Sequence, residues 1–557
     1  MRKLRVGLIV DDQKQPYLAH DLYRRSLESE YYSIECLVVQ RPVGRIRSRF
    51  GRLSEFIRKR GVRRLGGRLA LELVTALERR LLISRSRDLR RAFRSYDLTA
   101  FDVNRVVVHP IVSSSGFVYR YSPEDLSTVQ GLHLDVLLRY GSGILRGEIL
   151  SACDLGILSF HHGDNDVNRG GPPGFWEVVN KDNSTGFVIQ RLTSELDGGD
   201  VLLKGNIPTS PFYTENHARV LLKSNFFMHQ LLERLATSPQ IITVRPTVPY
   251  SFPLFTTPSL IKVLDYVFNA LRYVTIKAFG RILKRRLRWS VAFQYTDDWR
   301  NAVLWRSKVI KNPPYRFLAD PFVASKGERV VAFVEDFDIR LSRGKVSAYE
   351  LTPSGYSDLG IALEEDFHLS FPFVFHGDDG LFMIPESHEA KEIRLYKCTD
   401  FPLNWQLQRV LLGDIDAADS MLLKREDRWW LFTNKDSSEI GDYDSELHLY
   451  YSDSCDSNAW KAHPLNPVIF DSSCARNGGL VYAGDKVYRV FQRQGLDAYG
   501  KSMGIAEITD LTPDTYNETH ICDVTANFMK GIRGTHTYSF EAGVLCLDFV
   551  KVESYRR

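Results

Sequence analysis

One stretch in the first half of the chain joins a buried strand to several chemically active side chains. Residues 155–202 read LGILSFHHGDNDVNRGGPPGFWEVVNKDNSTGFVIQRLTSELDGGDVL. An apolar run of strand character, residues 155–160, ends directly in His161 and His162. A loop rich in glycine, asparagine and aspartate follows, and a turn containing Asp197 closes the stretch. Histidines at a strand end, a glycine-rich loop and a later acid indicate a functional site rather than a packed core.

The sequence around this stretch alternates between short apolar runs and helical patterns. Strands are predicted at residues 4–10, 34–40, 103–109 and 134–140, and helices at residues 17–27, 123–130, 147–152 and 215–237. This alternation favours an α/β fold with a parallel sheet. An arginine-rich helical insert, residues 41–103, interrupts it. We therefore expect a first domain over residues 1–237.

The motifs of residues 155–202 resemble the amino-terminal catalytic domain of the folate-dependent formyltransferases. In that family Asn-x-His ends a strand, and Arg-Gly, Pro, Thr-Gly and Leu-Asp-x-Gly-Asp follow. The matching residues here are Ser159-Phe160-His161, Arg169-Gly170, Pro173, Thr185-Gly186 and Leu196-Asp197-Gly198-Gly199-Asp200. The separation of His161 from Asp197 is 36 residues, about what the family shows. The resemblance implies a Rossmann-like domain that uses N10-formyltetrahydrofolate as co-substrate.

The resemblance also implies catalytic roles for three residues. His161 would be the general base, and Asp197 would orient its imidazole. Ser159 stands where the family has an asparagine, whose amide donates a hydrogen bond to the oxyanion of the tetrahedral intermediate. Four alternatives for that donor stay open: the Ser159 hydroxyl, a water held by it, His162, or a backbone amide.

Two further sets of residues are candidates for binding. The strand and glycine turn before residue 155 resemble the family's folate-binding segment. The cofactor candidates are Tyr140, Gly141, Gly143 and Ile144. The substrate-binding candidates are His162, Asn165, Arg169 and Trp176.

Basic charge is concentrated in two segments. The net charge is +5, but residues 41–94 carry +14 and residues 262–289 carry +7. Such segments either bind phosphate groups, acidic lipid or an acidic partner, or form solvated helix faces. Residues 238–258 are rich in proline and read as a linker. Residues 259–289 form a basic amphipathic helix that either lies on a membrane surface or connects two domains.

The remaining composition describes an ordinary intracellular protein. The seven cysteines are scattered without zinc-like spacing, so we expect reduced thiols and no metal site. The apolar run at the amino terminus is too short for a signal peptide. No apolar run reaches the roughly 18 residues that a transmembrane helix needs. We expect a cytoplasmic protein, with membrane association on the cytoplasmic side as the alternative for residues 259–289.

From residue 290 onward the chain consists of short strands and turns in similar units. Anchor positions recur near residues 320, 371, 419, 477 and 536. This spacing predicts an all-β five-bladed propeller over residues 290–557. The region resembles propellers of the glycoside hydrolase family 43 type. It looks closer still to the amino-terminal propeller of plant glucosamine inositolphosphorylceramide transferases.

In such hydrolases, acidic side chains from different blades meet on the axis. Asp320 and Asp419 fit two of these positions, and Glu386 is a candidate for the third. Arg476 stands where the third acid is expected. The propeller therefore either binds carbohydrate or, if two carboxyl groups have the required separation, hydrolyses a glycosidic bond.

Together these features favour an enzyme that transfers a formyl group to the amino group of a nucleotide-linked aminosugar. We expect a carbohydrate acceptor because the same chain contains a propeller that resembles carbohydrate-active ones. A nucleic-acid acceptor is not expected, because the small barrel that usually follows the catalytic domain is replaced here. The alternative is a non-catalytic or glycan-processing protein whose propeller recognises carbohydrate. The sequence gives no oligomeric state.

Overall fold

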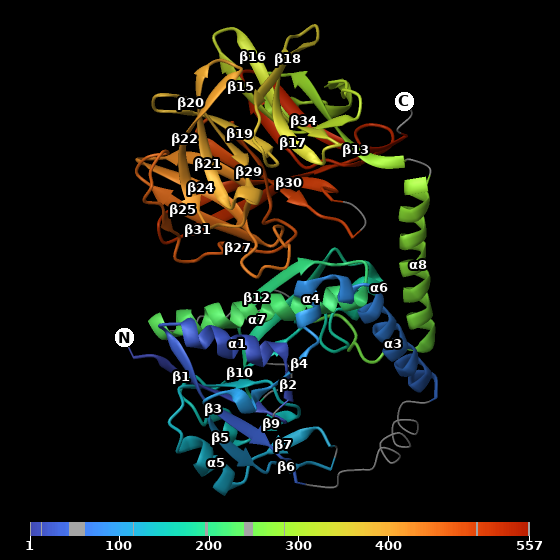
Figure 1. The fold of residues 1–557 in the computed structure, drawn as a ribbon, viewed down its shortest axis with the longest axis vertical. Helices are drawn as coiled ribbons and strands as arrows, with labels where there is room; N and C mark the ends of the chain where they lie inside the picture. Colours follow the sequence, from blue (N-terminus) through green and yellow to red (C-terminus); the bar gives the residue numbers. More distant parts are fainter. Residues whose placement is uncertain are drawn as a thin grey trace. The chain divides into compact units, whose positions relative to one another are not determined.

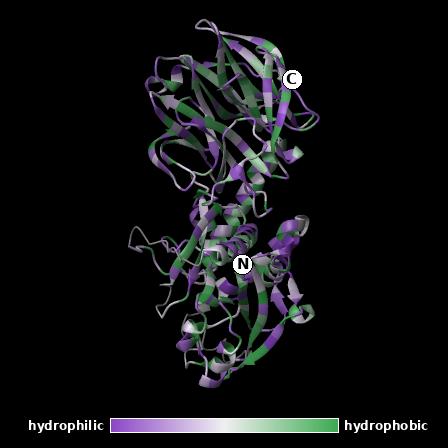
Figure 2. Cartoon of the chain, turned by 90° about the vertical axis from the view of Figure 1, so that its left-hand side faces the viewer, coloured by the Kyte–Doolittle hydropathy of each residue, from purple (hydrophilic) through white to green (hydrophobic). Residues whose placement is uncertain are grey.

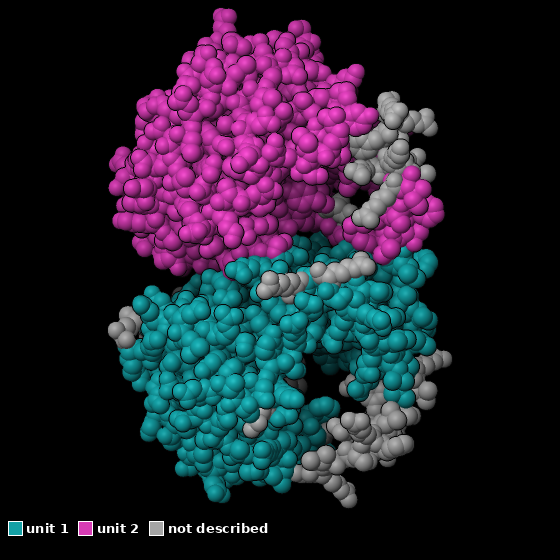
Figure 3. Space-filling view, viewed as in Figure 1, with its two compact units in different colours: residues 1–272, 438–440 teal, residues 273–437, 441–557 magenta. Residues whose placement is uncertain are grey.

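The chain forms two compact units in a computed structural model, which describes residues 2–12, 14–43, 62–114, 116–194, 199–238, 249–282, 285–496 and 499–554. Unit 1 comprises residues 1–272 and 438–440, and unit 2 comprises residues 273–437 and 441–557 (Figure 3). Of the segment predicted as linker and basic helix, residues 249–272 therefore belong to unit 1.

Unit 1 is built on a seven-stranded sheet in the order β12-β11-β10-β8-β1-β3-β5 (Figure 1). The strands are β1 (Leu4–Val10), β3 (Tyr32–Gln40), β5 (Asn104–Val108), β8 (Val136–Arg139), β10 (Ile157–His161), β11 (Ser184–Arg191) and β12 (Asp200–Pro208). The first five are parallel, and β11 and β12 are antiparallel. Parallel strands read as continuous apolar runs because both faces of the sheet are covered. The predicted parallel-sheet α/β domain is confirmed.

Helices cover both faces of this sheet. On one face lie α1 (Tyr17–Glu28) and α7 (Tyr213–Thr237), where Asn225 of α7 donates to the Leu18 carbonyl of α1. On the other face, α5 (Pro123–Gln130) and the short 3-10 helix η3 (Glu148–Ser151) pack on Ile9 and Ile157. The helix α5 begins as its sequence predicts, because the Ser122 hydroxyl accepts from the Asp125 amide at 3.1 Å.

The arginine-rich insert joins the basic helix in one packed layer. It supplies α3 (Val62–Leu81) and α4 (Arg87–Arg91), and α3 packs against α8 (Leu260–Ile282) and α6 (Phe175–Asn180). The Glu78 carboxylate on α3 accepts hydrogen bonds from Tyr266 of α8 and from the Thr214 amide of α7. Gly67 allows this approach, since a Cβ there would lie 2.1 Å from the Pro258 carbonyl oxygen. Residues 44–61 of the insert lie outside the described residues.

From residue 285 onward, unit 2 is all-β apart from short 3-10 helices and contains five antiparallel sheets among its described residues. Four follow the chain in order: β15–β18 (Arg316–Lys326, Arg329–Asp338, Arg343–Leu351, Tyr356–Leu363), β19–β22 (Ser370–Gly377, Gly380–Glu386, Glu392–Asp400, Asn404–Gly413), β23–β27 (Ala417–Arg425, Arg428–Lys435, Glu446–Ser452, Lys461–Ala462, Ile469–Phe470) and β28–β31 (Asn477–Ala483, Lys486–Arg493, Ser502–Leu511, Tyr516–Thr525). Both hydrophobic and hydrophilic residues occur along the strands (Figure 2), and inner strands such as β24 are buried along most of their length.

The fifth sheet joins the two ends of unit 2. It combines β13 (Arg285–Tyr295) and β14 (Lys308–Val309) with β32 (Ile532–Gly534), β33 (Tyr538–Glu541) and β34 (Val544–Ser554). Here β13 pairs along its whole length with β34, from Arg285 opposite Ser554 to Tyr295 opposite Val544. The first strands are neighbours in the order β15, β19, β23, β28, β33, and β33 returns to β15. Residues 285–289, predicted as the end of the basic helix, are therefore part of a strand, because they pair with the last strand of the chain.

A β-bulge recurs in the first strands of successive sheets. The pairing register shifts between Ala319 and Phe322, between Ser370 and Phe373, and between Ala418 and Met421. At these bulges Asp320, Phe371 and Asp419 have φ of 47°, 43° and 48°. A left-handed conformation is unfavourable for such residues, and bulges redirect side chains. The anchor positions near residues 320, 371 and 419 therefore lie at these bulges.

A buried polar network holds the loop after β10 against the start of α7. The Asn216 amide donates to the Gly174 carbonyl and to the Thr185 hydroxyl, each at 2.9 Å, and its oxygen accepts from the Ser210 amide at 3.1 Å. Asn216 and Thr185 are fully buried. Because water cannot replace these bonds, the network fixes the loop.

We predict that Asn216→Ala lowers the free energy of unfolding of unit 1 by about 3 kcal/mol, since it leaves several buried polar groups without partners. Hydrogen exchange of β10 and β11 amides in the full chain, measured against urea, reports on this unit alone. Asn269→Ala is the matched control, because among the described residues Asn269 donates only within α8, to Asp265. Equal effects of the two variants would contradict the assigned role.

Candidate functional site

The pleat of β10 separates the predicted site residues into two sets. Successive side chains of a strand point to opposite faces, so Ser159 and His161 share the face of Ile157, which packs on α5. Phe160 and His162 point to the face covered by α7. The same holds on β8, where Arg139 lies on the first face and Tyr140 follows on the second.

His161 is fixed by the loop that follows it. Its Nε2 lies 2.8 Å from the carbonyl oxygen of Asn168. A carbonyl only accepts, so Nε2 carries the hydrogen and Nδ1 holds the free electron pair. Gly163 permits this close loop, because a Cβ there would lie 2.8 Å from the Asn168 carbonyl oxygen. The imidazole therefore offers Nδ1 as its basic atom.

The loop itself is held at both ends. The Asn168 side-chain amide donates to Glu177 at 2.8 Å, and burial raises the pKa of that carboxyl. Lys204 on β12 binds the carboxylates of Asp164 and Asp166 at 2.8 and 2.6 Å. These contacts keep the Asn168 carbonyl in place beside His161.

His162 faces α7 rather than the His161 side. Its Nε2 lies 3.1 Å from the Ser224 hydroxyl, and its ring stacks on Phe160 with centroids 5.4 Å apart. Burial, followed by the nearby His217 and His161, lowers the pKa of His162 to about 3. His162 is thus a neutral, packed histidine at neutral pH, away from Ser159.

The four cofactor candidates form the turn after β8. Tyr140 donates to Asn225 at 2.9 Å on the α7 face, and burial raises the pKa of its phenol. A Cβ on Gly141 would lie 2.9 Å from Asp11 Oδ1, and one on Gly143 would lie 2.5 Å from the Tyr119 ring. Ile144 begins β9 (Ile144–Arg146). Both glycines are required by close approach of the protein's own atoms.

The other substrate candidates stabilise the loop and fasten residues 249–258 to it. Arg169 Nε donates to the Asn165 carbonyl at 2.8 Å, and its guanidinium lies 4.6 Å from the Tyr250 ring centre. The Trp176 indole donates to the carbonyls of Gly171 and Thr256, both at 3.2 Å. The segment predicted as linker is thus packed on this loop.

Asp197 lies outside the described residues, as does the whole turn of residues 195–198. The other acid of that motif, Asp200, pairs with Arg191 at 2.6 Å. The structure therefore brings Ser159 and His161 together on one face. The other described candidates of unit 1 lie in the loop and helix α6 after β10, in the turn after β8 or on the opposite face.

Arg139 is a site residue that the sequence interpretation missed. It ends β8 opposite Ser159, and its Nη1 lies 3.4 Å from the Ser159 hydroxyl. Its Nη2 donates to the Gly143 carbonyl at 2.5 Å. The available signal was an arginine at the end of an otherwise apolar strand, where a buried charge needs a reason.

Unit 2 gathers polar residues from the first two strands of each sheet. The anchors Asp320, Asp419 and Asn477 lie beside second-strand residues at a common register. Those second-strand residues are Glu335, Glu386, Asn434, Gln492 and Asp548. All are buried, apart from the partly buried Glu386. The predicted positions Asp320, Glu386 and Asp419 therefore belong to one repeated feature.

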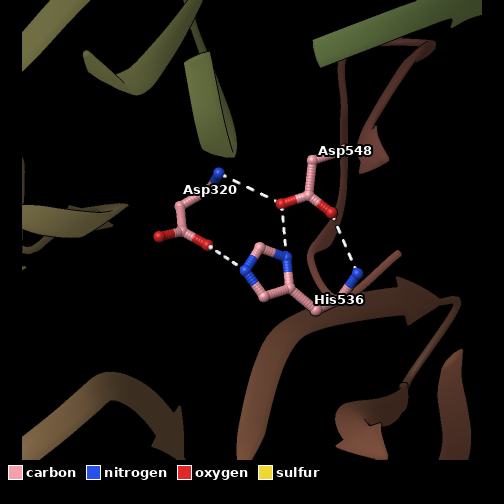
Figure 4. A group of neighbouring side chains, drawn as sticks. All are labelled: Asp320, His536 and Asp548. Carbon is pink, nitrogen blue, oxygen red and sulfur yellow. Dashed lines mark hydrogen bonds and ion pairs between the residues drawn. The ribbon is translucent and has the colours of Figure 1, made fainter. Parts of the chain in front are cut away.

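At one side of this cluster, His536 lies between two carboxylates (Figure 4). Its Nδ1 lies 2.5 Å from Asp548 and its Nε2 lies 3.5 Å from Asp320. Burial opposes ionisation, but the two carboxylates outweigh it and raise the pKa of His536. The ring stacks on Trp289 with centroids 4.0 Å apart. Sequence repeats placed an anchor near residue 536 but gave no role to the histidine.

These three side chains have the donor atoms of a cation site, which lie within 4.8 Å of one another. Their oxygens are already in use. Asp548 accepts from the amides of His536, Thr537 and Asp320, and Asp320 accepts from Thr537 at 2.8 Å and from the Phe371 amide at 3.3 Å. The arrangement fits a positively charged imidazole better than a metal ion.

On the other side of the cluster, Arg476 neutralises the acids. Its guanidinium binds Asp419 at 2.7 Å and Asp444 at 3.1 Å. Burial raises the pKa of Glu386. A 3.0 Å hydrogen bond from His388 and the charge of Arg476 outweigh this effect and lower the pKa to about 2. Glu335, by contrast, has a strongly raised pKa because of burial and the neighbouring acids Asp320 and Glu386. The surroundings of the cluster thus shift the pKa values of Glu386 and Glu335 in opposite directions.

Comparisons with known proteins divide along the same lines. Residues 299–542 match the family described as "Glucosamine inositolphosphorylceramide transferase 1, N-terminal". Glucosamine inositolphosphorylceramide transferase 1 of Oryza sativa subsp. japonica is 35% identical over 213 residues, 37% of this chain and 28% of that protein. The chain thus spans little more than a quarter of the length of this relative.

The amino-terminal region is similar to formyltransferases. Methionyl-tRNA formyltransferase of Solibacter usitatus is 30% identical over 90 residues, which cover 16% of this chain and 29% of that enzyme. Among solved structures, the catalytic domain of Coprinopsis cinerea GH62 α-L-arabinofuranosidase aligns with 12% identity and a TM-score of 0.33. That alignment covers 47% of this chain and 97% of the domain.

Proposed function

We propose that unit 1 transfers a formyl group from N10-formyltetrahydrofolate to the amino group of an aminosugar carried on a nucleotide or glycan. The observation that carries the proposal is His161, held with a free Nδ1 at the carboxyl edge of the parallel sheet. Ligands of open α/β sheets bind at this edge. The similarity of the region to methionyl-tRNA formyltransferases supports formyl transfer as the reaction.

In the proposed reaction the amine nitrogen attacks the formyl carbon, and the electrons of the C=O bond move to its oxygen. His161 Nδ1 accepts a proton from the amine. The oxyanion then reforms the carbonyl, the bond to N10 breaks, and N10 takes the proton from His161. The Asn168 carbonyl already fixes the imidazole tautomer, a role that the family resemblance assigns to Asp197. The orienting role that the resemblance implies for Asp197 stays a prediction, because Asp197 lies outside the described residues.

We infer that the five sheets of unit 2 are the blades of one propeller, supported by the closed order of first strands and by the β13–β34 pairing. We propose that its polar cluster binds the carbohydrate part of the acceptor. Binding is favoured over hydrolysis because Arg476 engages Asp419 where the hydrolase pattern has an acid. The alternative, a binding protein without chemistry, keeps this site and lacks folate binding.

We further propose that α3 and α8 attach the protein to an anionic membrane surface. Within unit 1, Ile261, Leu264, Phe268 and Leu271 are 57–74% exposed along α8. On α3, Leu69, Leu73, Leu77 and Leu81 are 51–62% exposed. Exposed basic residues of unit 1 flank these stripes on the same helices: Arg64, Arg68, Arg80, Lys262 and Arg272. No helix of the described residues is long and apolar enough to cross a membrane.

Apolar stripes bordered by basic residues suit an interface between acyl chains and acidic head groups. The seven cysteines, all free thiols, suit the reducing cytoplasmic side of such a membrane.

We expect His161→Ala to lower kcat about 100- to 10,000-fold, because proton transfer from the amine is lost. The assay follows formation of tetrahydrofolate from N10-formyltetrahydrofolate, with UDP-glucosamine as the first acceptor. His133→Asn is the control, since His133 is exposed with φ of 51°, a conformation that asparagine tolerates. A His161→Ala protein with wild-type turnover would end the mechanism. Failure of the wild type to bind 5-formyltetrahydrofolate in calorimetry would favour the binding-protein alternative.

For unit 2, Glu386→Gln is expected to weaken binding of glucosamine oligosaccharides about tenfold or more, because it removes a buried charge that His388 and Arg476 balance. Saturation-transfer NMR on the full chain measures this binding. Glu328→Gln, on an exposed turn, is the control and leaves binding unchanged. Release of monosaccharide by the wild type, abolished in Glu386→Gln, would instead establish hydrolysis.

For the membrane surface, the triple variant Leu264→Glu, Phe268→Glu and Leu271→Glu is expected to abolish co-sedimentation with vesicles of phosphatidylcholine and phosphatidylserine. Each buried apolar side chain contributes about 1.5–3 kcal/mol to such binding. The control makes the same charge change on exposed residues of unit 2, Ile361, Leu407 and Ile521. Co-sedimentation that survives the first variant, or is lost equally in both, would refute this surface.

A further inference from the structure

Arg139 is a charged group at the carboxyl edge of the sheet that has no carboxylate partner among the described residues. No ion pair involves it there, whereas neighbouring charges such as Arg191 and Lys204 are paired. The acid whose charge stabilises the charged form of Arg139 is Asp11. Asp11 is engaged elsewhere, by the Gln40 amide at 3.2 Å and by the Ser142 amide at 2.8 Å.

The hydrogen-bonding capacity of Arg139 is largely unused. A guanidinium has five N–H donors. In the described structure Nη2 donates to Gly143, Nη1 makes a long contact of 3.4 Å to Ser159, and Nε is buried without a partner. Burial lowers the pKa of Arg139, yet an arginine remains charged at neutral pH. A partly buried charge without a counter-ion among the described residues is costly, so its position favours a negative ligand.

The position of Arg139 places it beside the proposed chemistry. It pairs across the sheet with Ser159, the residue that replaces the family's asparagine. Ser159 and His161 are two residues apart on β10, so their side chains point to the same face. Arg139 points to that face as well. His162, the other candidate for an oxyanion donor, points to the α7 face and is excluded from this role.

We propose that Arg139, together with the Ser159 hydroxyl, donates hydrogen bonds to the formyl oxygen as it becomes negatively charged during transfer. This inference rests on the proposed formyl transfer. When the amine attacks the formyl carbon, the oxygen takes the electron pair of the C=O bond, and the charge returns to the carbonyl when the bond to N10 breaks. The donors neither gain nor lose a proton.

A charged donor compensates for the asparagine that is absent. Hydrogen bonds to ionised partners are about twice as strong as those between neutral groups. The long Nη1–Ser159 contact is weak, so either group turns to a stronger acceptor at little cost. The glycine turn fixes the guanidinium, because Gly143 supplies its carbonyl and packs on Tyr119.

The test compares Arg139→Gln, Arg139→Lys and Arg139→Ala in the full chain, with N10-formyltetrahydrofolate and UDP-glucosamine as substrates. Arg139→Gln is expected to lower kcat about 100- to 1,000-fold, with KM for the folate within about threefold of wild type. Arg139→Lys keeps the charge and a long stem, so an intermediate loss of about tenfold is expected. Ethylguanidinium should restore part of the activity of Arg139→Ala, an effect that a purely structural role does not give.

Arg120→Gln on β7 (Val118–Arg120), an exposed arginine of the same unit, is the matched control and keeps full activity. Binding of 5-formyltetrahydrofolate by each variant establishes that it is folded. If Arg139→Gln does not fold, Arg139→Lys and the rescue of Arg139→Ala carry the test. Wild-type kcat in a folded Arg139→Gln or Arg139→Lys protein, or a loss confined to KM, would overturn this inference alone. A wild type that neither binds 5-formyltetrahydrofolate nor releases tetrahydrofolate would overturn the proposed function and this inference with it.

Discussion

The alternation of side chains along β10 and β8 is the constraint on which the amino-terminal site depends. A strand sends successive residues to opposite faces, so the motif around His161 cannot place all its polar residues in one cavity. Ser159, His161 and Arg139 share one face, while His162 and Tyr140 are bonded to α7 on the other. The two histidines therefore differ completely. One holds a free Nδ1 at the edge of the sheet, and the other is packed and neutral.

The loop after β10 converts this arrangement into a defined geometry. The Asn168 carbonyl sets the tautomer of His161, and the Asn168 side chain is held in turn by Glu177. Backbone groups cannot change protonation state, so they fix a tautomer without competing for the proton. The packing of residues 249–258 on Arg169 and Trp176 adds a second layer of support. Reorientation of a preorganised base of this kind during a reaction costs little free energy.

Unit 2 differs from unit 1 because many charged groups are buried there in one cluster. Burial of carboxylates without compensation is costly, and here the cost is reduced in a different way for each acid. His536 balances Asp320 and Asp548, Arg476 balances Asp419, and Glu335 takes a raised pKa. Strained residues at the repeated bulges direct these groups inward. Natural proteins retain such features mainly at functional sites, which supports a ligand site in this unit.

The sequence by itself determined the parallel-sheet first unit, the all-β second unit and the position of His161 at a strand end. These follow from local patterns: apolar runs, the 50–60-residue recurrence of anchors, and a histidine directly after a buried strand. The role of Arg139 was decided only by the tertiary structure, because its pairing with Ser159 depends on β8 lying beside β10. The Asn168–His161 bond likewise depends on the path of a loop, which residue types do not specify. The pairing of His536 with Asp320 joins residues more than two hundred positions apart, and such contacts exist only once β33 has returned to β15.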